Sequence, residues 1–117
     1  MYRPKTIICD IDGTLIKHEP PDMLCKQKIE LLPGTIEKFR EWDKKGYSII
    51  LITGKKESLR TILENQLASA GLFYNQLIMG VGGGDRILIN DLKPNSNEPT
   101  AIAKNLERNK GIAELEI

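Results

Sequence analysis

The chain has few of the residues that form disulfide bonds or bind soft metals. It contains two cysteines and one histidine in 117 residues. Cys9 and Cys25 are too few for a disulfide framework and lack the spacing of a zinc site. Cys9 lies inside an aliphatic run, where a buried and unreactive thiol is the expected role. The sequence therefore predicts neither a disulfide scaffold nor a zinc-bound fold.

The sequence also has no large excess of either positive or negative charge, and it has no long apolar run. The net charge of +1 gives no electrostatic reason to expect nucleic acid or an anionic membrane as a partner. No apolar run approaches membrane-spanning length, and the N-terminus lacks the basic-then-apolar layout of a signal peptide. We expect a cytoplasmic protein with no nucleic-acid or membrane partner, built as a single domain over residues 1–117.

The chain does contain an alternation of strand-like and helix-like segments. Four short β-rich runs are nearly continuous in apolar residues, at 5–11, 47–53, 75–80 and 86–91. Amphipathic helical patterns occupy residues 33–46, 56–71 and 97–111. This alternation predicts an α/β fold, a three-layer Rossmann-like parallel sheet with helices on both faces. Right-handed crossovers predict a strand order of about 3-2-1-4.

Polar residues follow these strands where each one ends. Asp10 and Asp12 come after the first run, Thr53 and Gly54 after the second, and Asp91 after the fourth. Ligands of open parallel sheets sit beyond the carboxyl ends of the strands, so these residues are expected to converge on one site. Two acids this close repel each other, and a divalent cation that prefers oxygen ligands would relieve that repulsion. Capping of a solvated turn stays open as the other role of the two acids.

The glycine-rich stretch "GVGGGDR" at residues 80–86 does not indicate a dinucleotide site. Asp85 stands where the G-x-G-x-x-G pattern needs its last glycine, and a strand rather than a helix follows. We interpret the stretch as a tight connection between the third and fourth strands.

The motifs together resemble those of a known superfamily. "DIDGTL" after an aliphatic strand is similar to the first motif of the haloacid dehalogenase superfamily, phosphohydrolases built around Asp-x-Asp-Gly-Thr. "LITG" resembles its second motif, and "LINDLKP" resembles its acidic fourth motif, with Asn90 before Asp91. The third motif is a phosphate-binding Lys or Arg, for which Arg86 and Lys93 are the two candidates. The resemblance covers nearly the whole chain.

This resemblance implies a mechanism. Asp10 would be the nucleophile that forms an aspartyl-phosphate, and Asp12 would be the general acid and base. Mg²⁺ would be held by the Asp10 carboxylate, the Asp12 backbone carbonyl and Asp91. Thr53, the Gly54 amide and a basic residue would hold the phosphate oxygens. An acid at the second position is typical of the phosphatases and phosphomutases of the superfamily rather than of its dehalogenases.

The resemblance also implies a substrate class and leaves alternatives. We expect a Mg²⁺-dependent phosphohydrolase acting on a small phosphorylated metabolite, with a sugar phosphate suggested by similarity to small capless members. A phosphotransferase or phosphomutase, and a non-catalytic regulatory domain that binds metal or phosphate, stay open. A receiver-type signalling domain is disfavoured, because residues 75–80 offer no phosphoacceptor Asp at the end of the third strand.

Residues 15–32 predict a short, proline-broken flap in place of a cap domain. His18 in this flap is expected to be a solvated loop residue rather than a substrate contact. A capless site is open, so it either accepts large substrates or is closed by a neighbouring subunit. We therefore hypothesise a homo-oligomer in which a partner lends part of the pocket.

Overall fold

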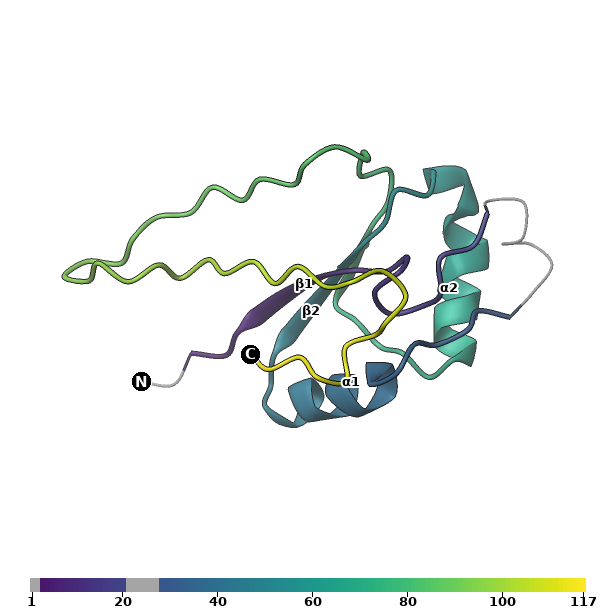
Figure 1. Cartoon of the computed structure of the whole chain (residues 1–117), viewed down its shortest axis with the longest axis horizontal. Coiled ribbons are helices and arrows are strands. Elements are labelled where there is room, and N and C mark those ends of the chain that lie inside the picture. Colours follow the sequence, from purple (N-terminus) through teal and green to yellow (C-terminus); the bar gives the residue numbers. More distant parts are fainter. Residues whose placement is uncertain (1–2, 21–27) are drawn as a thin grey trace.

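The computed structural model describes residues 3–20 and 28–117, so the middle of the predicted flap and Cys25 lie outside the described residues. The described part contains parallel strands joined by helices (Figure 1). Its elements are β1 (Thr6–Asp10), α1 (Thr35–Lys44), β2 (Ser48–Ile52), the 3₁₀ turn η2 (Glu57–Leu59), α2 (Arg60–Ser69) and β3 (Gln76–Ile78). The α/β class predicted from the alternation of apolar patterns is confirmed.

The sheet brings the carboxyl ends of its strands to one edge. Its order is β1-β2-β3 and both pairings are parallel, which agrees with the predicted order of the first three strands. Asp10 is level with Ile52, and Ile52 is level with Ile78. The residues that follow each strand therefore leave the sheet on the same rim, where the sequence places its polar groups.

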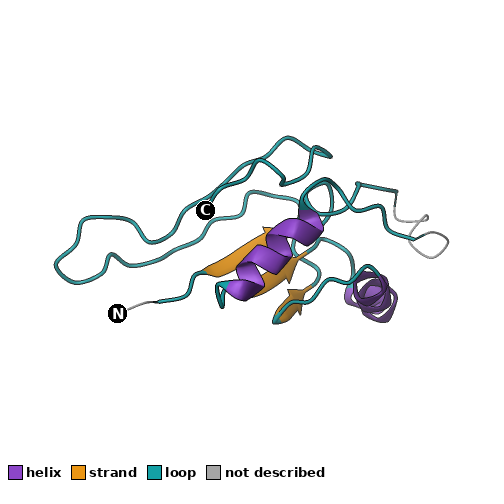
Figure 2. Ribbon diagram, turned by 90° about the horizontal axis from the view of Figure 1, so that it is seen from below, coloured by secondary structure: helices purple, strands orange, loops and turns teal. Residues whose placement is uncertain are grey.

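Both α-helices pack on one face of this sheet. Phe39 and Trp42 of α1 join Leu63 and Leu67 of α2 in a single buried cluster, together with the inward residues of the strands such as Leu51. Figure 2 shows α1 lying across the strands. Side chains of a strand alternate between faces, and on the opposite face Ile8 and Ile78 are exposed while Ile52 is partly buried. The predicted helix layer on both faces is therefore wrong for the described residues.

The start of α1 is tied to the loop that follows β1. The hydroxyl of the buried Thr35 donates to the Leu15 carbonyl oxygen at 2.8 Å and lies 2.9 Å from that of Leu32. Leu15 and Leu32 are themselves joined through a backbone hydrogen bond of 2.9 Å. Hydrogen bonds therefore hold both ends of the flap, Leu15 and Leu32, to each other and to the start of α1.

The predicted fourth strand and third helix do not form. Residues 82–107, here called the arm, are irregular and project away from the helices as two long limbs (Figures 1 and 2). The Asn90 side-chain amide donates to the Thr100 hydroxyl at 2.8 Å and so links the two limbs. The radius of gyration is 15.1 Å, above the roughly 13 Å of a compact domain of this length. The arm accounts for this elongation.

A short connection explains why residues 86–91 do not pair beside β1. A crossover between parallel strands needs about a dozen residues or more, because the chain must return along the sheet before it starts the next strand. Only residues 79–85 separate the end of β3 from Arg86. Residues 86–91 have the apolar composition of a strand, but the connection is too short to bring them to the free edge of β1 in the parallel direction.

The helical pattern at 97–111 fails for a related reason. Isolated helices of this length are marginal in water and take most of their stability from packing an apolar stripe on a neighbour. Here Ile102 is 76% exposed and Leu106 is also exposed, so the stripe has nothing to pack on.

In the described residues, no helix is both long and apolar enough to cross a membrane.

Candidate functional site

The turn after β1 sets the direction of the two acids. Gly13 has φ of +83°, a left-handed conformation that favours glycine. Its amide donates to the Ile16 carbonyl oxygen at 2.8 Å, and the Leu15 amide donates to that of Ile11 at 2.9 Å. This tight turn ends the strand and leaves Asp10 and Asp12 at the rim, both partly buried. The sequence "DIDGT" thus forms a structured loop rather than a solvated tail.

Asp10 is held by a hydroxyl and by a cation. The Thr14 hydroxyl donates to Asp10 Oδ2 at 3.1 Å. The Arg86 guanidinium, from the start of the arm, donates to Asp10 Oδ1 through Nη1 at 2.9 Å. Asp10 keeps 30% of its side chain exposed, so the carboxylate remains accessible from the rim. Of the two candidates for the basic residue, Arg86 is the one that reaches the site.

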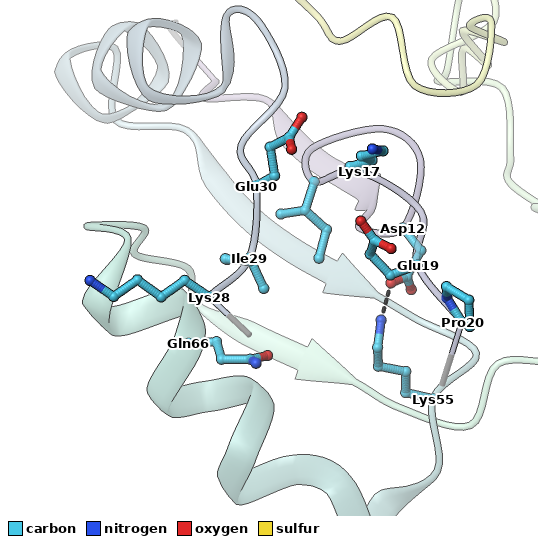
Figure 3. A pocket seen from close by; sticks show the side chains of 10 residues that line it. Asp12, Lys17, Glu19, Pro20, Lys28, Ile29, Glu30, Lys55 and Gln66 are labelled. Carbon is cyan, nitrogen blue, oxygen red and sulfur yellow. Dashed lines mark hydrogen bonds and ion pairs between the residues drawn. The ribbon is translucent and has the colours of Figure 1, made fainter. Parts of the chain in front are cut away.

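Asp12 is bound by groups that follow β2. The buried Thr53 hydroxyl donates to Asp12 Oδ2 at 2.6 Å. The Lys55 ammonium contacts Asp12 Oδ1, and its backbone amide donates to Thr53 Oγ1 at 3.2 Å. Lys55 is 15% exposed and Asp12 20%, so this ion pair is far better shielded than a surface pair. Figure 3 shows the two side chains pointing at each other.

Sequence reasoning missed Lys55, although it lies directly after the Thr53-Gly54 pair that was singled out. Lysine in a loop is usually solvated, and nothing in the local pattern marks it. The signal that could have revealed it is parallel register: Asp10 is level with Ile52, so residues just beyond Ile52 face those just beyond Asp10. With Lys55 included, the rim holds two ion pairs, Asp10 with Arg86 and Asp12 with Lys55, so its positive and negative charges are equal in number.

The backbone of Gly54 lies close to the backbone of Val81. A Cβ added at Gly54 would lie 3.1 Å from the Val81 carbonyl oxygen, which is tighter than most contacts of that kind. Among the described residues, no hydrogen-bond acceptor is assigned to the Gly54 amide, which lies beside the Thr53 hydroxyl. A hydroxyl and an exposed amide at a strand end suit a phosphate oxygen.

Asp91 and Lys93 do not join the site in this chain. Lys93 Nζ lies 2.8 Å from Asp91 Oδ1, and both residues are exposed on the arm. The hydrogen bond and charge of Lys93 lower the pKa of the Asp91 carboxyl. Within residues 3–20 and 28–117, no group of three acidic, histidine or cysteine side chains comes together as a metal site. The structure brings Asp12 and Thr53 together at the rim beside Asp10 and Gly54, whereas Asp91, the other residue expected to converge there, lies apart on the arm.

Cys9 takes no part in the chemistry of the rim. It is buried, and burial together with the charge of Asp10 raises its thiol pKa to about 12. A thiol with so high a pKa carries almost no thiolate at neutral pH and is a poor nucleophile. The predicted role of Cys9 as a buried, inert residue agrees with this environment.

The ends of the flap form a small hollow next to Asp12 (Figure 3). An antiparallel bridge joins Ile16 to Leu31, and the Lys17 amide donates to the Glu30 carbonyl oxygen at 2.9 Å. The cavity is about 30 Å³, space for a water molecule but not for a metabolite. Its lining consists of Asp12, Ile16, Lys17, Glu19, Pro20, Lys28, Ile29, Glu30, Lys55 and Gln66. A substrate must therefore approach along the open rim.

His18 lies on the outer side of the flap. Its backbone amide donates to the Asn109 side-chain oxygen at 2.9 Å, and its side chain is exposed. The Asn109 amide in turn donates to the Gly13 carbonyl oxygen at 2.7 Å. The chain following the arm thus supports the turn that carries the acids.

Comparison with known proteins identifies relatives of this sequence. Residues 7–107 match the family described as PITM 1-3, LNS2 domain. No curated protein sequence gives a significant match. The family match spans most of the chain, including the rim loop, both described helices and the arm.

Solved structures share the fold. A chain of the Pnkp1/Rnl/Hen1 complex superposes with a TM-score of 0.59 at 28% identity, over 72% of this chain and 30% of that chain. This chain therefore corresponds to less than a third of that protein's length. A structural-genomics target from Vibrio cholerae gives a TM-score of 0.55 at 23% identity, over 77% of this chain and 84% of that one.

A weaker likeness is to D,D-heptose 1,7-bisphosphate phosphatase from B. bronchiseptica, determined with magnesium and phosphate. Its TM-score is 0.46 at 19% identity, over 69% of this chain and 52% of that one.

Proposed function

Because the chain belongs to the LNS2 domain family, and with it to the haloacid dehalogenase superfamily as a small phosphatase-type member, we propose that it hydrolyses a phosphate monoester at the rim. The observation that carries the proposal is the pairing of Asp10 with Arg86 and of Asp12 with Thr53 and Lys55. Two acids in different environments are what a division between nucleophile and acid–base catalyst requires.

The proposed reaction has two steps. An oxygen of the Asp10 carboxylate attacks phosphorus, the bond from phosphorus to the leaving-group oxygen breaks, and Asp12 donates a proton to that oxygen. Asp12 then accepts a proton from water, which attacks the aspartyl-phosphate and releases inorganic phosphate. Asp10 is regenerated, and no redox partner is needed.

The remaining groups of the rim bind and orient the phosphoryl group. Arg86 and Lys55 each pair with a carboxylate here and can turn their donors toward the phosphoryl oxygens when substrate arrives. The Gly54 amide supplies a further donor at the end of β2. Positive groups fixed near the transferred phosphoryl group stabilise the charge that develops in the transition state.

The donor set at the rim fits Mg²⁺, which prefers oxygen ligands and is usually bound through one or two carboxylates together with substrate phosphate. The Asp10 carboxylate and the Asp12 backbone carbonyl would hold it. When bound, the ion would offset the repulsion between an anionic nucleophile and an anionic phosphate. Asp91, the third ligand implied by resemblance, does not reach these groups within the chain.

We propose a small phosphorylated metabolite, for example a sugar phosphate, as substrate, and the cytoplasm as the setting. The open rim and the clamped flap support a substrate that presents its phosphate end-on and leaves the remainder outside. A phosphotransferase or phosphomutase would share the first step and differ only in the acceptor of the phosphoryl group.

A panel of phosphorylated metabolites tests the proposal. We expect phosphate release with Mg²⁺, its loss when the metal is chelated, and a phosphorylated protein in acid-quenched samples analysed by mass spectrometry. The peptide that carries the phosphate should contain Asp10. Absence of turnover across a broad panel, without any phosphorylated intermediate, would contradict the proposal.

Replacement of Lys55 by methionine separates its role from that of general surface charge. We expect kcat/KM to fall about ten- to a hundredfold, the effect of losing one charge-assisted contact of about 1.5–3 kcal/mol. Lys56→Met is the matched control, because Lys56 is exposed and has no contact with either acid. Equal losses in the two variants would show that Lys55 has no specific role.

A non-catalytic phosphate-binding domain is the second candidate, and one contact favours it. Lys55 occupies an oxygen of the proposed acid–base residue, and Asp91 stands outside the site. Such a domain would bind inorganic phosphate in a manner that depends on Arg86 and Lys55 but would show no turnover. Calorimetric titration with phosphate, beside the metabolite panel, distinguishes the two functions.

A further inference from the structure

A cleft opens on the sheet face away from the helices, beside the proposed nucleophile. Side chains alternate along a strand, so Asp10 leaves β1 on the same face as Ile8. Parallel register puts Ile52 of β2 level with Asp10, on that face as well. Ile8 is 51% exposed, and Ile52 is only partly buried. The carboxylate of Asp10 therefore stands at the end of an apolar surface that neither described α-helix covers.

The root of the arm forms the other wall of this cleft. The cleft has a volume of about 450 Å³, within the range of roughly 300–1,000 Å³ that is usual for ligand pockets. Its lining consists of Ile8, Ile52, Val81, Gly82, Gly84, Asp85, Arg86, Ile87 and Leu88. Arg86 belongs to this lining and also donates to Asp10 Oδ1 at 2.9 Å. One residue thus joins the cleft to the proposed phosphate site, and a substrate held by Arg86 can occupy both.

The fold gives no reason for the two glycines of the lining. A position requires glycine where φ is positive or where a Cβ would collide with a neighbour. Gly82 and Gly84 meet neither condition, because their φ values lie outside the left-handed region and an added Cβ would have nothing within 4 Å. Glycine also serves where a ligand approaches the backbone closely. A ligand in the cleft would account for both residues.

The lining favours a flat ring that carries an N–H donor. Aliphatic side chains stand on both walls, Ile8 and Ile52 on the sheet and Ile87 and Leu88 on the arm. The same lining contains Asp85, whose carboxylate forms no hydrogen bond or ion pair with another described residue. An alkyl chain would use the walls but not this acceptor, and a polyol would use the acceptor but not the walls. A heterocyclic base with an amino or imino group uses both.

We infer that the cleft binds the base of a nucleoside monophosphate whose phosphate is held at the rim by Arg86. Such a role rests on the proposed function and narrows it, because a nucleoside monophosphate is a sugar phosphate whose sugar carries a base. The rim leaves the non-phosphate part of the substrate outside, and the cleft is the adjoining surface that can bury it. Burial of the base contributes binding energy that a bare sugar phosphate lacks. No atom of the base reacts, so the hydrolysis at Asp10 is the same for every nucleotide.

Two substrates that differ in the base measure this contribution. Adenosine 5′-monophosphate and ribose 5-phosphate present the same primary phosphate ester. We expect kcat/KM to be at least about tenfold higher for adenosine 5′-monophosphate. Equal values would overturn the role of the cleft and leave the phosphatase intact. A preference for octyl phosphate over both would also overturn it, since that ester has an alkyl chain and no N–H donor.

Serine substitutions on the exposed limb locate the contact. Ile87 lines the cleft, whereas Ile89 lies two residues further along the arm and does not. Both side chains are highly exposed, 82% and 90%, so neither change should unfold the protein. We expect Ile87→Ser to lower the ratio of the two kcat/KM values about fivefold to tenfold, and Ile89→Ser to preserve it. Equal effects of the two changes would contradict a contact in the cleft.

The glycines offer a second matched comparison. Gly83 lies between Gly82 and Gly84 in the sequence but outside the lining, and a Cβ there would also have nothing within 4 Å. Gly84→Ala places a methyl group on the wall of the cleft and should raise the KM for adenosine 5′-monophosphate about threefold or more. Gly83→Ala restricts the backbone to the same extent and should not. Equal increases would show that the glycines serve chain mobility, which would overturn the inference.

Calorimetry separates the role of the cleft from the proposed catalysis. In the Asp10→Asn chain, which should not turn over, adenosine 5′-monophosphate is expected to bind at least about tenfold more tightly than ribose 5-phosphate. The same preference in a native chain that shows no turnover would contradict the phosphatase and leave the cleft standing. Turnover of ribose 5-phosphate without any preference for the nucleotide would do the reverse.

Discussion

Replacing Asp10 with asparagine is expected to lower turnover by at least about a thousandfold, because the amide is neutral and a far weaker nucleophile than the carboxylate. The change preserves size; the amide oxygen can still accept from Arg86, and the amide nitrogen can donate to the Thr14 hydroxyl. The fold should therefore survive while the first chemical step is lost. Initial rates of phosphate release, at substrate concentrations around KM, measure the effect.

Asp43→Asn is the matched control for this experiment. Asp43 is an exposed acid of α1, remote from the rim, and the same chemical change there should leave turnover unaltered. Thermal melting of both variants checks that neither has unfolded. Native turnover in the Asp10 variant would remove this residue as the nucleophile, whereas a loss in both variants would indicate a general effect of charge.

The parts of the site that could be predicted from sequence depend on local patterns. An aliphatic run that ends in Asp10 and a second that ends before Thr53 indicate strands and their ends, because the period of apolar residues is a property of a few neighbouring residues. Parallel pairing then places both ends on one rim. The contact between Thr53 and Asp12 follows from that register, and the structure has it at 2.6 Å.

The parts that could not be predicted depend on relations between distant segments. Residues 86–91 have the composition of a strand, but composition does not report whether a connection is long enough to bring the strand to its edge. The same holds for the helical stripe around Ile102, which needs a surface to pack on. Asp91 was placed in the site by its pattern, and the short connection after β3 keeps it away.

The largest loss of stability is expected from Gly111→Ala, because Gly111 lies where the end of the chain meets the start of α1. Its φ is +85°, and an added Cβ would lie 2.4 Å from the Pro33 carbonyl oxygen, a contact that no side-chain rotation can relieve. The adjacent Ile112 is buried and its amide donates to the same oxygen at 2.9 Å. The left-handed backbone costs alanine about 1–2 kcal/mol, and displacement of the segment adds about 1–3 kcal/mol. We expect the free energy of unfolding to fall by about 3 kcal/mol, measured by urea denaturation.

Gly46→Ala separates these two contributions. Gly46 also has a positive φ, +73°, but an added Cβ would have nothing within 4 Å. This variant should lose about 1 kcal/mol from backbone strain alone. The excess loss in Gly111→Ala then measures the collision with Pro33, and equal losses would show that the chain end is not held against α1. Because Asn109 supports the carbonyl of Gly13 from the same segment, the excess should appear also as weaker phosphate binding at the rim. The end of the chain is thereby part of what holds the turn that carries Asp10 and Asp12.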